Sequence, residues 1–76
     1  MPNLPHLSGR EIIRALERLG FKQARQRGSH VVMKKSITGG SIGCVIPMHD
    51  EVAIGTLRSV LRQAHLSPEE FIEAVK

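Results

Sequence analysis

The chain has 76 residues, of which 41% are hydrophobic, and a formal net charge of +4. This length predicts one small domain, residues 1–76, and the lack of an apolar run of about 18 residues excludes a transmembrane helix. A single cysteine, Cys44, excludes an internal disulfide and favours a reducing compartment, so we expect a cytoplasmic protein.

A first helix is predicted over residues 9–19. Ser8 and Glu11 have the spacing of a capping box, and Gly20 stands where a helix favours a left-handed residue after its end. Apolar residues recur at helical spacing between them, at Ile12, Ile13, Leu16 and Leu19. The row Arg10, Arg14 and Arg18 falls on the opposite side, which we interpret as a solvated face.

Three strands follow, predicted over residues 21–27, 29–35 and 42–46. Gly28 predicts a tight turn between the first two, and residues 36–41, with Gly39 and Gly40, predict a hairpin turn. Pro47 is expected to end the third strand because proline cannot donate a hydrogen bond to a sheet ladder.

Residues 48–55 predict a loop, and a second helix is predicted from Thr56. A second capping box, Ser67 with Glu70, starts a short terminal helix with Pro68 in its first turn. The order α-β-β-β-α plus a short α predicts an α+β fold. In it, the helices cover one face of a three-stranded antiparallel sheet, as in double-stranded-RNA-binding domains.

The charge is concentrated in one half of the chain. Residues 1–35 carry eight Lys and Arg against two Glu, for a net +6, whereas residues 36–76 carry a net −2. A basic half favours a polyanionic partner, and nucleic acid is the leading candidate. The alternative is a basic surface without a specific role.

His30 is the main candidate for chemistry. A period of two places it on the same face as Val32 and Lys34, with Lys35 on the other face, but the sequence does not show which face the helices cover. Gly28 would let a phosphate approach the backbone, Ser29 could orient the ring or donate to a phosphate, and the candidate phosphate contacts are Arg25, Arg27, Lys34 and Lys35. An imidazole can remove the proton of an RNA 2′-hydroxyl at cellular pH. The alternative is a partly buried histidine without a role.

Other chemistry has less support in the sequence. His49, next to Asp50, is a secondary candidate, although a hydrogen bond that holds the loop is the favoured explanation. The spacing of the histidines and the single cysteine predicts no metal site, and no motif predicts a cofactor. The general acid could be His49 or a lysine.

Several short motifs follow one another along the chain: Ser8-Gly9-Arg10-Glu11, Leu19-Gly20-Phe21, Arg27-Gly28-Ser29-His30, Val45-Ile46-Pro47-Met48-His49, and Gly55-Thr56-Leu57-Arg58 running on to Leu61-Arg62-Gln63-Ala64. In the order of these motifs and in its length, the sequence resembles the HicA toxin family. The resemblance implies a double-stranded-RNA-binding-like fold, metal-independent cleavage of messenger RNA and a HicB-type antitoxin that blocks the site. It also implies that His30, which follows Gly-Ser, is the catalytic histidine.

One position departs from the family pattern, and two other functions compete with a ribonuclease. Members commonly have glycine where this chain has His65, so His65 must be left-handed or the second helix must end differently. One competing function is a non-catalytic module that binds duplex RNA. The other is an interaction protein whose main role is to bind an acidic antitoxin.

Overall fold

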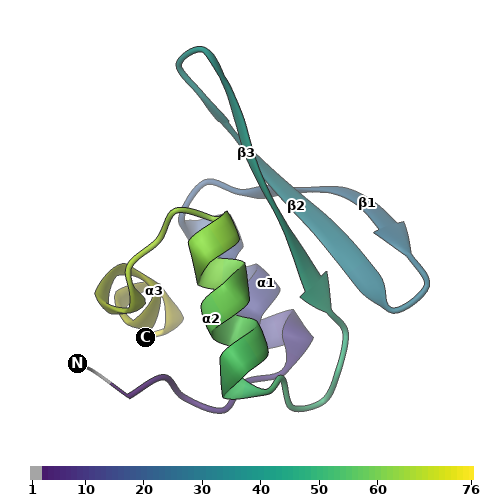
Figure 1. The fold of residues 1–76 in the computed structure, drawn as a ribbon, viewed down its shortest axis with the longest axis vertical. Coiled ribbons are helices and arrows are strands. Elements are labelled where there is room, and N and C mark those ends of the chain that lie inside the picture. The colour runs from purple at the N-terminus through teal and green to yellow at the C-terminus, as the bar shows by residue number, and fades with distance from the viewer. Residues whose placement is uncertain (1–2) are drawn as a thin grey trace.

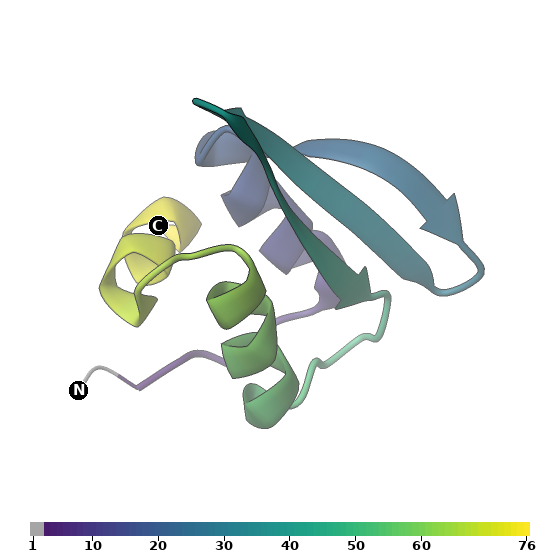
Figure 2. The ribbon, with the colours of Figure 1, turned by 45° about the horizontal axis from the view of Figure 1, so that its top comes forward.

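The computed structural model describes residues 3–76. Its elements are α1 (Gly9–Arg18), β1 (Lys22–Arg27), β2 (His30–Ile37), β3 (Gly40–Pro47), α2 (Ile54–Gln63) and α3 (Pro68–Val75) (Figure 1). The strands form one antiparallel sheet in the order β1-β2-β3, and the helices gather on one side of it (Figure 2). The predicted α+β fold, with the layout of a double-stranded-RNA-binding domain, is confirmed. Within residues 3–76, no helix combines the length and the apolar character that crossing a bilayer requires.

One hydrophobic core fills the space between the sheet and the helices. The sheet contributes Val31, Met33, Cys44 and Ile46, and the helices contribute Ile12, Leu16, Leu57, Val60, Leu61 and Phe71. No polar or charged side chain is buried in the part of the chain that the structure describes. The helices therefore cover the face of β2 that carries Val31 and Met33, and the opposite face is open.

Two of the three helices begin at the predicted capping boxes. Glu11 N donates to Ser8 Oγ at 3.2 Å and Glu70 N to Ser67 Oγ at 3.1 Å, and each glutamate accepts from the backbone of its serine. These hydrogen bonds hold the pKa of both glutamates below the usual range. By contrast, α2 begins at Ile54, two residues before the predicted Thr56, after an Ala53 that makes no side-chain cap.

The hairpin between β2 and β3 is longer than predicted. Both strands continue through the segment predicted as a turn, so Ser36 pairs with Ser41 and only Thr38 and Gly39, the latter with φ +85°, connect the strands. The sequence overestimated the turn because Ser and Gly are weak strand formers. The hairpin projects well beyond the helices (Figure 1).

Arg18, the last residue of α1, joins this helix to the end of α3. Arg18 Nη1 donates to the carbonyl oxygens of Ala74, at 2.8 Å, and Lys76, at 3.2 Å. These carbonyls lie at the C-terminal end of α3, where the helix dipole favours a positive charge. Arg10 and Arg14 are exposed as predicted, but Arg18 also binds α3.

The second helix ends in a left-handed turn at His65, which is one of the two alternatives that the sequence left open. His65 has φ +58°, Leu66 N donates to the Leu61 carbonyl at 3.0 Å, and His65 N donates to the Arg62 carbonyl at 3.3 Å. This is a Schellman motif. Gly20, with φ +97°, has the same place after α1.

Replacing His65 with glycine should stabilise the protein by about 0.5–1 kcal/mol, because a left-handed backbone is unfavourable for a residue with a Cβ. The midpoint of thermal unfolding, followed by circular dichroism, should rise by about 2–8 °C. Gly20→Ala is the matched control and should lower the midpoint, since it forces a Cβ into the same conformation. A His65→Gly protein no more stable than the parent would contradict this explanation.

Candidate functional site

A two-residue turn places His30 at the start of β2. Arg27 pairs directly with His30, and Gly28 and Ser29 connect them. Gly28 has φ +54°, whereas Ser29 is not in the left-handed region, as expected for a type II′ turn with glycine first. Met48 N donates to the Ser29 carbonyl at 2.7 Å, which fixes the turn to the end of β3. His30 therefore lies on a well-supported hairpin.

His30 lies on the open face of the sheet. Its side chain is exposed, as is that of Lys34, while Val31 and Met33 between them are buried against the helices. The predicted grouping of His30, Val32 and Lys34 on one face is confirmed, and this face is the one that the helices leave free. A partly buried histidine, the alternative reading, is not what the structure shows.

The open face carries cations and no carboxylates. Arg27 lies opposite His30, and Arg25 lies opposite Val32, so both arginines share the face of the histidine. None of the three strands contains Asp or Glu. Because Lys34 follows on the same face of β2, the imidazole stands in a cationic environment that suits a phosphate backbone.

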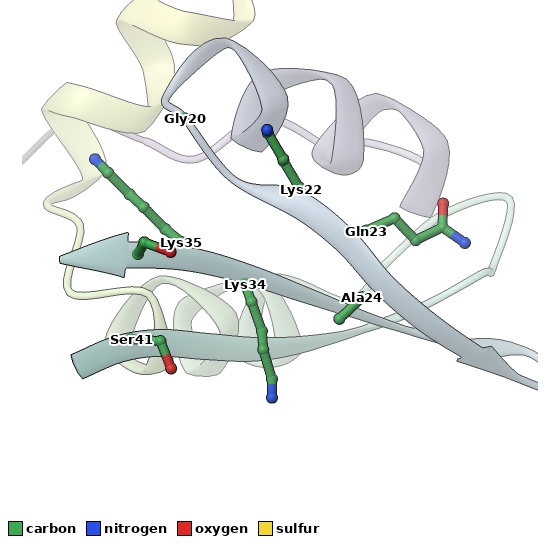
Figure 3. A pocket seen from close by; sticks show the side chains of 8 residues that line it. Gly20, Lys22, Gln23, Ala24, Lys34, Lys35 and Ser41 are labelled. Carbon is green, nitrogen blue, oxygen red and sulfur yellow. The ribbon is translucent and has the colours of Figure 1, made fainter.

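A β-bulge in β1 brings Lys22 to the open face, which the sequence did not predict. The register shifts between Gln23 and Arg25, with Ala24 as the extra residue, so Lys22 pairs with Lys34 instead of Lys35. Figure 3 shows the side chains of Lys22 and Lys34 directed away from each other around a hollow beside Ala24. Simple alternation would have paired Lys22 with Lys35, and no residue in β1 signals the bulge.

Lys35 borders the same hollow as Lys34, but its side chain takes a different direction from the other candidate phosphate contacts. It points away from Lys34 (Figure 3), and its Nζ stands 5.8 Å from the centre of the Phe21 ring on the side of the helices. After the hydrogen bonds from Ser67, its charge also helps to lower the pKa of Glu70 in α3. Lys35 thus supports the packing between sheet and helices.

His49 occupies a different place from His30. It lines a hollow with Asp50, Ser8, Arg10, Gln26 and Met48, and His30 is not among the residues that line this hollow. Its carbonyl accepts from Gly9 N at 2.9 Å. Across residues 3–76, no hydrogen bond or ion pair joins Asp50 to the His49 ring. The structure therefore gives no support to a fixed His49 tautomer.

The remaining reactive groups are structural. Cys44 is buried, and burial raises the pKa of its thiol to about 11, which keeps it protonated. In the described part of the chain, no group of three or more His, Cys, Asp or Glu side chains is placed to hold a metal ion.

Comparison with known proteins assigns the chain to a family. No curated protein matches it. The model of a family described as the HicA toxin of bacterial toxin–antitoxin systems matches residues 9–66, from the start of α1 to just beyond the end of α2. This match covers most of the chain, including the turn that positions His30. The chain belongs to the HicA toxin family and is the toxin of a toxin–antitoxin system.

Proposed function

We propose that the protein is an endoribonuclease that cleaves messenger RNA, with His30 as its acid/base and without a metal ion. The observation that carries the proposal is the exposure of His30 on an open sheet face that bears cations and no carboxylates. Membership of the toxin family supports it. The family match does not include the role of His30, which we infer from its position.

The chemistry follows from what RNA itself supplies. The imidazole takes the proton of the 2′-hydroxyl, and the 2′-oxygen bonds to the adjacent phosphorus while the bond from phosphorus to the 5′-oxygen breaks. The leaving 5′-oxygen takes up a proton, so the products are a 2′,3′-cyclic phosphate and a 5′-hydroxyl. Arg27, directly opposite His30, is positioned to stabilise the negative charge that builds on the phosphoryl oxygens.

The remaining contacts hold the strand around the scissile bond. Arg25 and Lys34 would bind flanking phosphates, because they lie on the His30 face on adjacent strands. Gly28 leaves open space where a side chain would stand, and Ser29 beside it is exposed, so both can approach the phosphate backbone. His49 is a secondary candidate, and its separate hollow gives it no defined role in the proton transfers.

RNA cleaved by the purified protein in excess chelator should carry 5′-hydroxyl ends. These ends accept a label from polynucleotide kinase without prior phosphatase treatment, and the partner fragments should need removal of a cyclic phosphate before ligation. An RNA with 2′-O-methyl groups should stay intact, because it lacks the nucleophile. Loss of cleavage in chelator, or products with 5′-phosphates, would contradict the mechanism. Duplex RNA bound but never cut would instead support a non-catalytic module.

A HicB-type antitoxin would inhibit the protein by covering the open face. We expect acidic residues on the antitoxin, because Lys22, Arg25, Arg27 and Lys34 offer only positive charge there. An interface of ordinary size, about 800 Å² on each partner, would be large enough to exclude RNA from His30. Both partners and the RNA substrate would meet in the cytoplasm.

A further inference from the structure

An apolar pad lies beside His30 on the open face. Val32 and Val45 pair directly across β2 and β3, and Val45 is 41% exposed. Among residues 3–76, Ile37, 44% exposed at the hairpin tip, is the other large hydrophobic side chain with such exposure. The Val45 N–H donates to Gln63 Oε1 at 3.0 Å, so this N–H points away from β2. The valines therefore form a non-hydrogen-bonded pair, in which the two side chains lie close together.

The charged side chains near this pad lie on β1 and β2, and none lies on β3. Arg25 pairs with Val32 on β1, and His30 and Lys34 lie two residues away along β2, about 7 Å in each direction. On β3, by contrast, Val45 is flanked on the same face by Gly43 and Pro47, which carry no charge. The open face thus has its cations on β1 and β2, while the outer strand β3, about 10 Å from β1, forms an uncharged strip.

Strand addition by a partner does not account for the exposure of Val45. A partner strand that paired with β3 at this point would need the outward Val45 N–H, which already donates to Gln63 of α2. The glutamine thus closes the sheet edge at Val45 and leaves the valine side chain exposed above it. What remains is a surface suited to a flat apolar group.

We propose that the Val32–Val45 pad is a platform for one unpaired nucleobase of the RNA. The proposal rests on the nuclease function above and specifies its substrate as single-stranded at the cut. An unpaired nucleotide presents an anionic backbone on one side and a flat apolar base on the other, which matches the cations on β1 and β2 and the uncharged strip on β3. In a duplex the base faces its partner and cannot reach the pad. The platform thereby places the neighbouring phosphate near His30 and Arg27.

Binding can be tested apart from cleavage with 2′-O-methyl oligonucleotides, which lack the nucleophile. The probes are a fluorescein-labelled single strand, its blunt duplex and an abasic strand of equal length, measured by fluorescence anisotropy at fixed salt. The single strand should bind more tightly than the abasic strand, and more tightly than the duplex despite the higher charge of the duplex.

Val45→Tyr and Val45→Ala test the pad in opposite directions. An aromatic ring should stack on the base and tighten binding of the single strand by about fivefold or more, while alanine should weaken it by about threefold. Neither should change binding of the abasic strand. Ile37→Tyr and Ile37→Ala are matched controls, because Ile37 has similar exposure at the tip of the same hairpin, and they should change neither. Because Val45→Tyr is a gain, a folding defect cannot mimic it.

The results separate this proposal from the nuclease function. Equal effects of the Val45 variants on base-bearing and abasic strands would overturn the platform, as would tighter binding of the duplex or equal effects of the Ile37 variants. Binding that depends on the base, without cleavage of unmodified RNA, would support the platform and contradict the nuclease function. Cleavage that ignores Val45 and cuts paired nucleotides would do the reverse.

Discussion

Replacing His30 with alanine should lower the rate of RNA cleavage by about 10²- to 10⁴-fold, the usual contribution of a general base. Imidazole is the side chain generally suited to proton exchange at cellular pH. Among the described residues, the neighbours of His30 on the open face are arginines and lysines. The measurement is the single-turnover rate on labelled RNA with protein in excess. A folded His30→Ala protein that cleaves at the parental rate would remove His30 from the mechanism.

The folded state should be unaffected by this substitution. The His30 side chain is exposed and makes no hydrogen bond or ion pair among the described residues, so the free energy of unfolding should change by less than about 0.5 kcal/mol. His6→Ala is the matched control. His6, in the segment before α1, is also an exposed histidine, and its Nδ1 lies 3.7 Å from Glu51 Oε2 in the loop before α2. Its loss should leave the rate unchanged.

A third variant decides between the two candidate histidines. His49→Ala should reduce cleavage far less than His30→Ala, because His49 lines a separate hollow beside Arg10. If the large loss followed His49 instead, the reactive centre would lie at that hollow. Growth arrest on expression of each variant provides a second readout in cells.

The sequence predicted the features that depend on local spacing. Both capping boxes, the tight turn at Gly28 and the alternation of β2 are set by residues a few positions apart, and all were found, although the turn takes in Ser29 as well. The face of His30 followed from that alternation. Which face would be open depends on where the helices pack, and a period of two cannot supply that information.

The missed features depend on contacts between distant segments or on backbone irregularity. The bulge at Ala24 changes the partner of Lys22 without a distinctive residue type. Arg18 looked like a solvated residue because its partners, the carbonyls at the end of α3, are more than fifty positions away. The early start of α2 was missed because Ala53 offers no capping side chain.

Gly9, at the start of α1, makes a contact with the end of β3 that the sequence also did not predict. In the sequence it is an unremarked member of a capping box. In the structure it is buried, its N–H donates to the His49 carbonyl at 2.9 Å, and a Cβ there would overlap the Pro47 carbonyl oxygen and stand 3.0 Å from Met48 Cα. These are backbone atoms, which cannot turn aside as a flexible side chain would.

Replacing Gly9 with alanine should therefore destabilise the protein by about 2–3 kcal/mol, the cost of overpacking a tight contact. A domain of this size has only about 4–11 kcal/mol of stability in total. The chain has no Trp or Tyr, so urea unfolding followed by circular dichroism at the helix band is the suitable measurement. The midpoint should fall with little change in the slope.

Gly55→Ala is the matched control, and its expected effect has the opposite sign. Gly55 also lies in the first turn of a helix, but nothing stands within 4 Å of its potential Cβ, so alanine should stabilise α2 by up to about 1 kcal/mol through helix propensity. Equal stabilisation by both substitutions would show that α1 does not press against β3. Because Pro47 pairs directly with His30, the strain in Gly9→Ala should also reach the strand that carries His30. Cleavage per folded molecule should then fall in Gly9→Ala and stay at the parental level in Gly55→Ala.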